Sequence, residues 1–342
     1  YMGSANLAHK RARSCDPQAG STSPHDFPGT PAMRYDDRVT LLNTDYRKCV
    51  DASERVAWSV DSVIPPDAKL DFSRSFMPDA MFLAGRLSSL SADEKRKLNQ
   101  IFGNSYRYLF YFVEAYIIAS TMEHARAEVF GDPDALRALV RFADEEVKHQ
   151  QLFVRAGELF DRDFGSACDL TDSPQEVASY ILSKSPMAVL MITLHLEIIT
   201  QAHYVDSVRD NAAIDPLFSS LLKHHWLEEA QHAKLDALEL EKLRAFASEE
   251  QVATAEAEYE ELLGAFAGLL GRQATLDVGN LERATGTTYS PELRAEIENA
   301  QRLSYWRAFL WYGLTNSQFL EYLGERFPNL RTKADELAAR YC

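Results

Sequence analysis

The stretch that decides the fold reads HHWLEEAQH and spans residues 224–232. Within it, Glu229 and His232 are three residues apart. On an α-helix with about 3.6 residues per turn, two side chains at this spacing lie on one face and can reach a common point. One helix can therefore offer both of them to a metal ion. A single Glu-x-x-His sequence is weak evidence, because an acidic helix contains it by chance.

The same spacing recurs 83 residues earlier, in the stretch DEEVKH at residues 144–149. There Glu146 and His149 take the places of Glu229 and His232, and in both copies an acid directly precedes the ligand-type glutamate. Two further glutamates follow the same offset. One lies 32 residues before Glu146 and the other 32 residues before Glu229; they are Glu114 and Glu197.

Helix-start signals repeat with the same offset. Asp-Pro pairs stand at 132–133 and at 215–216. An Asp at the N-cap followed by Pro at the first helical position is a strong helix start. We therefore predict helices from 133 to about 160 and from 216 to about 246, each the second member of a duplicated helix pair.

The other two glutamates lie in strongly apolar surroundings. Glu114 lies within YLFYFVEAYII, at 108–118, and Glu197 lies within the apolar stretch 187–199. Helices that are apolar on nearly every face are buried, and a buried carboxylate needs a partner. No matching lysine lies nearby, which disfavours the alternative of buried Glu and His residues that only form salt bridges. A metal would satisfy these carboxylates.

Together, four carboxylates and two imidazoles converge inside four helices: Glu114, Glu146, His149, Glu197, Glu229 and His232. Such a donor set suits iron or manganese. Over residues 91–247 it resembles the ferritin-like di-iron carboxylate superfamily. The resemblance implies an all-α fold, a ferritin-like four-helix bundle with additional N- and C-terminal helices, that holds two Fe ions, with Mn or mixed Mn/Fe as alternatives.

The resemblance also assigns the two preceding acids. In bacterial multicomponent monooxygenases and ribonucleotide reductase small subunits, such an acid can bond the metal-bound imidazole of the other motif. Carried over, Glu228 would orient His149, and Glu145 would orient His232. The physical reason is general, because a ligating imidazole needs its second ring nitrogen held by an acceptor. The alternative for either acid is a solvated helix face.

His225 departs from the duplicated pattern. It precedes Glu229 by four residues and His232 by seven, whereas the equivalent position in the first half is Phe142. A His-x-x-x-Glu-x-x-His helix is similar to the p-aminobenzoate N-oxygenase family, which implies a third imidazole at the di-iron site. The alternative is a histidine that supports the ligands without binding the metal, or one of the core. The other histidines near the motifs, His195, His203 and His224, are not expected to be ligands.

The rest of the chain divides around the metal bundle. We expect an extended arm at 1–33, an N-terminal helix (about 35–58) and wrapping segment at 34–90, the four-helix di-metal bundle at 91–247 and a C-terminal helical extension at 248–342. Ser91 and Glu94 form a capping box, as do Ser248 and Gln251. The aromatic-rich extension is expected to pack across the bundle, or to form the wall of a substrate pocket or a dimer face.

Composition limits the partners. The 342 residues are 46% hydrophobic, enough for a large core, and the formal net charge is −15. Such acidity argues against nucleic acid and anionic membranes. No uninterrupted apolar run approaches the roughly 20 residues of a membrane span. The four cysteines lack close pairing, so we expect reduced thiols and a cytoplasmic protein.

The leading functional hypothesis is a non-haem di-iron oxygenase or oxidase that activates O2 to oxidise a small organic substrate. An external electron donor is expected, and a homodimer is a fair default. N-oxygenation of an amine is implied by the resemblance alone. A ferroxidase or iron-storage protein stays open. So does a ribonucleotide-reductase-like radical protein, which would need a tyrosine near the metal: Tyr108, Tyr111 or Tyr116.

Overall fold

The computed structural model describes residues 45–171 and 174–342, and this part of the chain is mainly helical. It contains no strand, only an isolated bridge between Ser75 and Ile214. The expected all-α class is confirmed. The expected arm at 1–33 and the first residues of the 34–90 segment lie outside the described residues.

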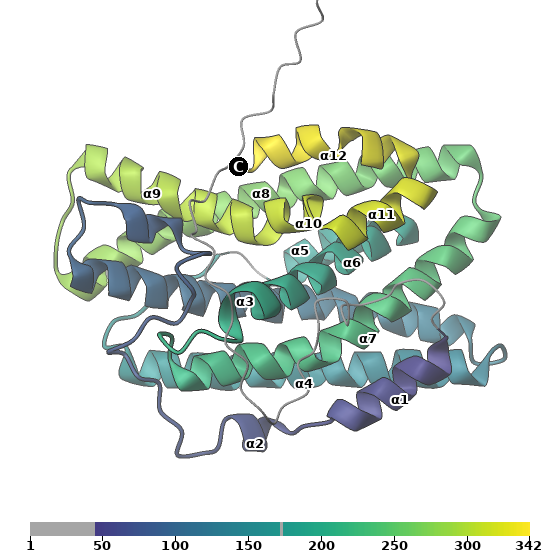
Figure 1. Ribbon diagram of the computed structural model, residues 1–342, viewed down its shortest axis with the longest axis horizontal. Helices are drawn as coiled ribbons and strands as arrows, with labels where there is room; N and C mark the ends of the chain where they lie inside the picture. The colour runs from purple at the N-terminus through teal and green to yellow at the C-terminus, as the bar shows by residue number, and fades with distance from the viewer. Residues whose placement is uncertain (1–44, 172–173) are drawn as a thin grey trace, which may run out of the picture.

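Four long helices carry the motifs: α3 (Ala92–Ala127), α4 (Pro133–Asp163), α6 (Pro186–His203) and α7 (Pro216–Phe246). α3 packs mainly against α4, and α6 against α7. α4 and α7 are both 31 residues long, and their first and last residues differ by the same 83 positions. In Figure 1, α4 and α7 lie on one side of this group and α3 and α6 on the other. The repeat in the sequence is therefore a repeat of whole helices.

The helix starts follow from their caps. Asp132 accepts hydrogen bonds from the N–H groups of residues 134 and 135, and Asp215 accepts one from the N–H of residue 218. Ser91 and Glu94 form a reciprocal capping box at the start of α3. These bonds satisfy N–H groups that a helix start otherwise leaves unpaired. Beyond α4, Gly165 adopts a left-handed conformation with φ of 80°, which favours glycine.

α6 is the core helix. With the π-helical turn η3 (Tyr204–Val208) that continues it, this segment is long and apolar enough to cross a membrane, with a mean hydropathy of 1.3. The sequence has no uninterrupted apolar run of this length, because polar residues such as His195 and Glu197 interrupt the segment. In the structure 94% of the apolar window is buried inside the protein. Burial of this kind is typical of a central helix that other helices surround.

Short helices cover the α4 and α7 side. α1 (Tyr46–Val56) and α2 (Val60–Val63) pack against both helices. The single helix expected at 35–58 ends at Val56, because Ala57 is extended with ψ of 134° and Ser59 caps α2 instead. Residues 57–59 thus form a three-residue linker between these helices.

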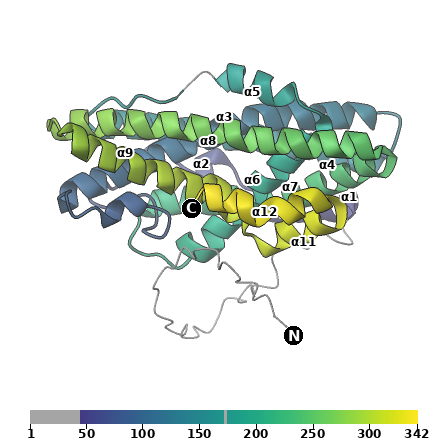
Figure 2. The ribbon, with the colours of Figure 1, turned by 90° about the horizontal axis from the view of Figure 1, so that it is seen from above.

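The opposite side is covered by the C-terminal extension. It consists of α8 (Glu249–Thr285), α9 (Pro291–Trp306), the π turn η4 (Arg307–Trp311), α10 (Tyr312–Leu314), α11 (Ser317–Arg326) and α12 (Pro328–Arg340). α8 and α9 run side by side along the long axis (Figure 2), and α8 contacts both α3 and α6. α5 (Pro174–Leu182) packs on α3, and a short 3-10 turn, η2 (Leu83–Arg86), contacts α3 and α9.

Two histidines of α6 form hydrogen bonds with the backbone of this extension. His195 Nε2 lies 3.0 Å from the carbonyl of Phe309, and His203 Nε2 lies 3.0 Å from the carbonyl of Ala308. Both carbonyls belong to η4, where the regular α-helical pairing is interrupted. His195 and His203 therefore have structural partners away from the motif residues.

The described cysteines differ in whether they form a disulfide. Cys49 and Cys168 are free, as the sequence reading expected, whereas Cys342 is disulfide-bonded. Burial raises the pKa of both free thiols to about 12, so neither is a reactive thiolate at neutral pH.

Candidate metal centre

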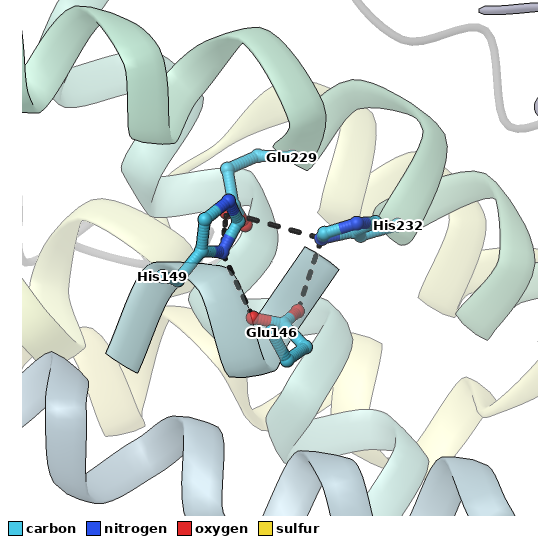
Figure 3. Close-up of side chains that lie close together, drawn as sticks. All are labelled: Glu146, His149, Glu229 and His232. Carbon is cyan, nitrogen blue, oxygen red and sulfur yellow. Dashed lines mark hydrogen bonds and ion pairs between the residues drawn. The ribbon is translucent and has the colours of Figure 1, made fainter. Parts of the chain in front are cut away.

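The two Glu-x-x-His motifs meet at the centre of the protein. α4 supplies Glu146 and His149, and α7 supplies Glu229 and His232 (Figure 3). All four side chains are buried, and one ligand-type atom of each lies within 4.8 Å of those of the others. The duplicated helices thus bring the duplicated donors together, in a cluster that could hold a metal ion.

Glu146 lies between the two imidazoles. Its Oε2 atom is 2.9 Å from His149 Nδ1, and its Oε1 atom is 3.0 Å from His232 Nδ1. Glu229 Oε1 is 3.4 Å from His149 Nδ1 and 3.9 Å from His232 Nδ1. Both histidines therefore direct Nδ1 inward, towards a shared set of carboxylate oxygens.

The apolar helices supply the remaining two glutamates. Glu114 of α3 places Oε1 3.3 Å from His225 Nε2, and Glu197 of α6 places Oε2 3.9 Å from His232 Nδ1. Both residues are buried, with 2% of their surface exposed. With Glu146 and Glu229 they surround the inward-facing imidazoles, so all four helices contribute a carboxylate.

His225 also joins this group. Its Nε2 atom lies 2.9 Å from Glu229 Oε1, besides its contact with Glu114. A second set of donor atoms within 4.8 Å of one another consists of Glu114, His149 and His225. The rings of Phe110 and Phe153 pack edge-on against the imidazole, with both centroids 5.0 Å away. The structure therefore places His225 among the donors.

The outer nitrogens of the two motif histidines bind carboxylates across the helix pair. His149 Nε2 lies 3.0 Å from Glu228 Oε2, and His232 Nε2 lies 2.9 Å from Glu145 Oε2. These are the pairs that the resemblance implies. An Nε2–H that donates to a carboxylate leaves Nδ1 as the free donor atom for a cation.

Each outer carboxylate has a further partner that the sequence reading missed. Lys148 Nζ lies 2.5 Å from Glu228 Oε1. Ser53 of α1 donates a hydrogen bond to Glu145, and Arg141 lies 3.8 Å from the same carboxylate. Lys148 and Arg141 lie close to the motif in sequence and could have been considered, whereas no pattern distinguishes Ser53.

Burial and mutual repulsion shift the pKa values of the clustered carboxylates. Burial raises the pKa of Glu114, Glu197 and Glu229 well above the ordinary value, and neighbouring carboxylates add to the effect. Burial would also raise the pKa of Glu146, but the adjacent His232 and His149 hold this pKa well below its ordinary value. Without a cation, such crowded carboxylates must retain protons.

Burial and the neighbouring charges also shift the pKa values of the imidazoles. Burial alone would lower the pKa of His149 and His232, but the nearby Glu146 raises both. Burial, with His149 close by, lowers the pKa of His225 well below its ordinary value. His225 is therefore neutral, the form in which an imidazole binds a metal.

Buried polar atoms that make no hydrogen bond test whether the residues fit a metal. Four cluster atoms that lie close to other donors are fully buried and make no hydrogen bond of regular geometry: Glu146 Oε1, Glu197 Oε2, Glu229 Oε1 and His232 Nδ1. The Nδ1 atom of His225, whose Nε2 atom faces the carboxylates, is also unpartnered. Buried polar atoms in folded proteins are nearly always satisfied. A cation among these donors would satisfy all four, so the residues fit a bound metal.

A cavity lies among α3, α5, α6 and α8, and the donor residues themselves do not line it. Its volume is about 430 Å³. Val113 and Leu196, which line it, directly precede Glu114 and Glu197 in the chain. α8 thus forms the wall of a pocket, which was one of the expectations for the C-terminal extension.

The tyrosines named from the sequence differ in position. Tyr116 is buried and lines this cavity. Tyr108 and Tyr111 are half-buried, and the Tyr108 hydroxyl lies 3.3 Å from the carbonyl of Thr171. Burial raises the pKa of Tyr116 well above its ordinary value, and the nearby Asp236, Glu197 and Glu114 add to the effect.

Comparison of the chain with models of protein families, with curated proteins and with solved structures found no match.

Proposed function

We propose that this protein is a non-haem di-iron oxidoreductase with a ferritin-like four-helix bundle, which activates dioxygen to oxidise a small organic substrate. One observation carries the proposal. Two histidines from duplicated helices direct Nδ1 inward with Glu146 between them, and each binds an outer carboxylate through Nε2. An arrangement of this kind presents two sets of donors, with the Glu146 carboxylate between the two imidazoles.

The donors divide between two ions. Glu114, His149 and His225 would hold one ion; Glu197, Glu229 and His232 would hold the other, and Glu146 lies where it can serve both. Carboxylates with imidazoles suit iron or manganese. We propose two Fe ions, with Mn or mixed Mn/Fe occupancy as the alternative that metal analysis distinguishes.

The chain's own residues prepare this site. Glu228 and Glu145 hold the Nε2–H of His149 and His232, which fixes each ring and its tautomer. Full burial excludes bulk water from the donors. When bound, two reduced iron ions supply the electrons that dioxygen needs before it can oxidise an organic molecule.

The cavity beside α3 and α6 supports a small, largely apolar substrate. Its lining is mainly aliphatic and aromatic, and Tyr116 contributes a buried hydroxyl. Polar side chains of Glu176, Tyr180 and Arg272 lie at the exposed end. A cavity of this size accommodates a substrate of roughly one or two aromatic rings. An arylamine is the first substrate to test, because the resemblance implies N-oxygenation.

The test begins with anaerobic iron loading. We expect two Fe(II) ions per chain and, after mixing with oxygen, a rapid change in the optical spectrum that the Glu229→Ala variant loses. Ser220→Ala, a change on α7 outside the cluster, serves as the control. Turnover of an arylamine with an added reductant then tests the oxygenase. Uptake of many irons per chain would instead indicate storage, and absence of stoichiometric metal would refute the proposal.

A further inference from the structure

Exposed apolar side chains gather on α3 and α4. The described part of the chain has nine large hydrophobic residues that are exposed. Six of them lie on α3, on α4 or in the turn between the two helices: Met122, Val129, Phe130, Val140, Val147 and Val154. In Figure 2, α3 lies on the side of the molecule away from α11 and α12. Contiguous apolar surface of this kind marks a site of interaction with another molecule.

The pairing of the two helices brings these side chains together. Gln150 Nε2 of α4 donates a hydrogen bond to the carbonyl of Tyr111 in α3, at 3.2 Å. The helices are antiparallel neighbours joined by a short turn, so residues whose numbers add up to about 261 lie side by side. Met122 therefore lies level with Val140, and these two residues are 48% and 45% exposed. The exposed face thus extends across both helices.

Along α4 the exposed apolar positions repeat every seven residues. Val140, Val147 and Val154 follow one another at this interval, and the last two are 39% and 43% exposed. Exposed polar residues alternate with them: Arg137, Asp144, Gln151 and Glu158. Apolar residues at a strict seven-residue interval form a stripe along one side of a helix, the pattern by which two helices pack on each other. This side of α4 therefore suits a partner helix.

The stripe is complementary to a reversed copy of itself. When a second copy of the chain lies antiparallel across Val147, this residue meets its own copy. Val140 then meets Val154 of the second copy, and Arg137 lies opposite Glu158 of the second copy. A parallel arrangement would instead place Arg137 beside Arg137 and Glu158 beside Glu158, which repel each other. Reciprocal contacts of the first kind are those of a two-fold symmetric interface.

We propose that this face is the interface of a homodimer, in which α4 of one copy packs antiparallel on α4 of the other and α3 flanks the contact. From Arg137 to Glu158 the helix is about 32 Å long, and α3 and α4 together are about 20 Å wide. Each copy thus offers about 600 Å², and the pair about 1,200 Å², the lower end of stable specific interfaces. The proposal requires no bound metal, so it stands apart from the function proposed above.

Sedimentation velocity of the full chain at micromolar concentrations measures the state of association. We expect a dimer in the wild-type protein. Val147→Glu places two carboxylates on the two-fold axis and should weaken the dimer about a hundredfold or more. Phe246→Glu makes the same change at an exposed apolar residue at the end of α7 and should leave the dimer intact. Circular dichroism checks that both variants fold. A monomeric wild-type protein, or a dimer that Val147→Glu does not weaken, would overturn the proposal.

Charge reversal tests which residues meet across the interface. Arg137 Nη2 also donates to Glu54 Oε1 within the chain, at 2.6 Å. The series is therefore made in the Glu54→Gln background, which removes this ion pair and should itself leave the dimer unchanged. Arg137→Glu and Glu158→Arg should each weaken the dimer about tenfold, because each places like charges opposite one another at two places. The double variant should restore association, and its failure to do so would contradict the pairing of Arg137 with Glu158.

Cysteine cross-linking tests the orientation, with oxidised wild-type protein as the background. Val147→Cys should form a disulfide-linked dimer on mild oxidation, because each copy meets itself on the two-fold axis. Val140→Cys alone should form none, whereas co-expressed Val140→Cys and Val154→Cys chains should become linked to each other. Linking of Val140→Cys to itself would show a parallel pair and overturn the proposed arrangement. Absence of a link in Val147→Cys would exclude the axis at this residue.

Discussion

His225 is the donor that breaks the symmetry of the two halves. The residue 83 positions earlier is Phe142, whose ring stacks on His232, whereas His225 directs Nε2 towards Glu229 and Glu114. Replacing His225 by Phe gives the second half the side chain that the first half already uses. It removes one nitrogen donor and keeps a ring in the aromatic pocket.

We expect His225→Phe to fold normally and to bind iron about 10–100-fold more weakly, the loss typical when support for a metal is removed. Anaerobic Fe(II) titration measures this. His224→Phe is the control, because His224 Nδ1 already bonds the carbonyl of Ser220 and faces away from the donors. Equal iron affinity in His225→Phe and wild-type protein would show that His225 is not a ligand.

Proton binding at the centre sets a pH dependence for the metal-free protein. The pKa values of Glu114, Glu197 and Glu229 are raised from 4.5, and those of His149 and His232 are raised from 6.5. The folded state therefore binds more protons than the unfolded chain, and these groups contribute stability that is lost as pH rises. Glu146 and His225 have lowered pKa values and oppose the trend at acid pH.

His195, His203 and His225 have lowered pKa values and oppose this trend below about pH 6.5, the ordinary value of histidine. Above it the raised groups act alone, so we expect the free energy of unfolding of metal-free protein to fall from about pH 6.5 to pH 8. Metal ions replace the protons, so stabilisation by Fe(II) or Co(II) should grow over the same range. Urea unfolding with and without metal, at several pH values, measures both. A metal-free protein that gains stability steadily over this range would contradict the assignment of buried protons to the cluster.

At the scale of the helix, the two Asp-Pro starts have unequal roles. Asp132 is exposed and caps α4 alone. Asp215 is buried, caps α7, and also accepts the N–H of Asp71 at 2.8 Å. Asp132→Ala should cost about 1 kcal/mol of stability and Asp215→Ala about 2 kcal/mol or more, because the second change also leaves a buried N–H unpaired. Chemical denaturation of both variants measures the difference. Equal losses would refute the added role of Asp215.

The attachment of the C-terminal extension depends on a glycine. A Cβ atom at Gly313 would collide with the ring of His195, and that ring cannot move freely because the Tyr259 hydroxyl and the Phe309 carbonyl hold its two nitrogens. Gly313→Ala should destabilise the protein by about 2 kcal/mol or more.

Gly264 provides the matched control for this change. It lies within α8, and a Cβ atom there would meet nothing within 4 Å. Gly264→Ala should stabilise the helix by roughly 0.5–1 kcal/mol. Thermal unfolding of the two variants gives the signs directly. A neutral Gly313→Ala variant would contradict the close packing of α10 on α6.

Local signals made the helices predictable. α4 begins at Pro133 and α7 at Pro216, as the Asp-Pro pairs indicated, and the capping boxes mark the starts of α3 and α8. The first helix was less predictable, because its apolar pattern continues to Trp58 while the extended backbone at Ala57 ends it. The two π turns follow from tertiary packing, and no local signal in the sequence marks them.

At the scale of the whole molecule, the site was predictable to the extent that it is repeated. The offset of 83 residues relates the donors of α4 to those of α7, and fixed spacing on a helix places Glu and His on one face. Ser53 and Trp58 were not predictable as neighbours of the site. They come from a covering layer with no repeat, and the position of that layer is decided by packing against α4 and α7.

The helices are arranged in layers around the proposed metal centre. Four helices enclose the donors, the C-terminal extension completes the cavity on one side, and the layer that contains Trp58 covers the other (Figure 1). The central claim is that two metal ions lie between α4 and α7. The measurement that tests it most directly is an anomalous difference map at the iron absorption edge, from crystals of anaerobically iron-loaded protein. The account predicts two peaks, one beside His149 and one beside His232, with the Glu146 carboxylate between them. No peak among these donors, despite iron in the crystal, would contradict it.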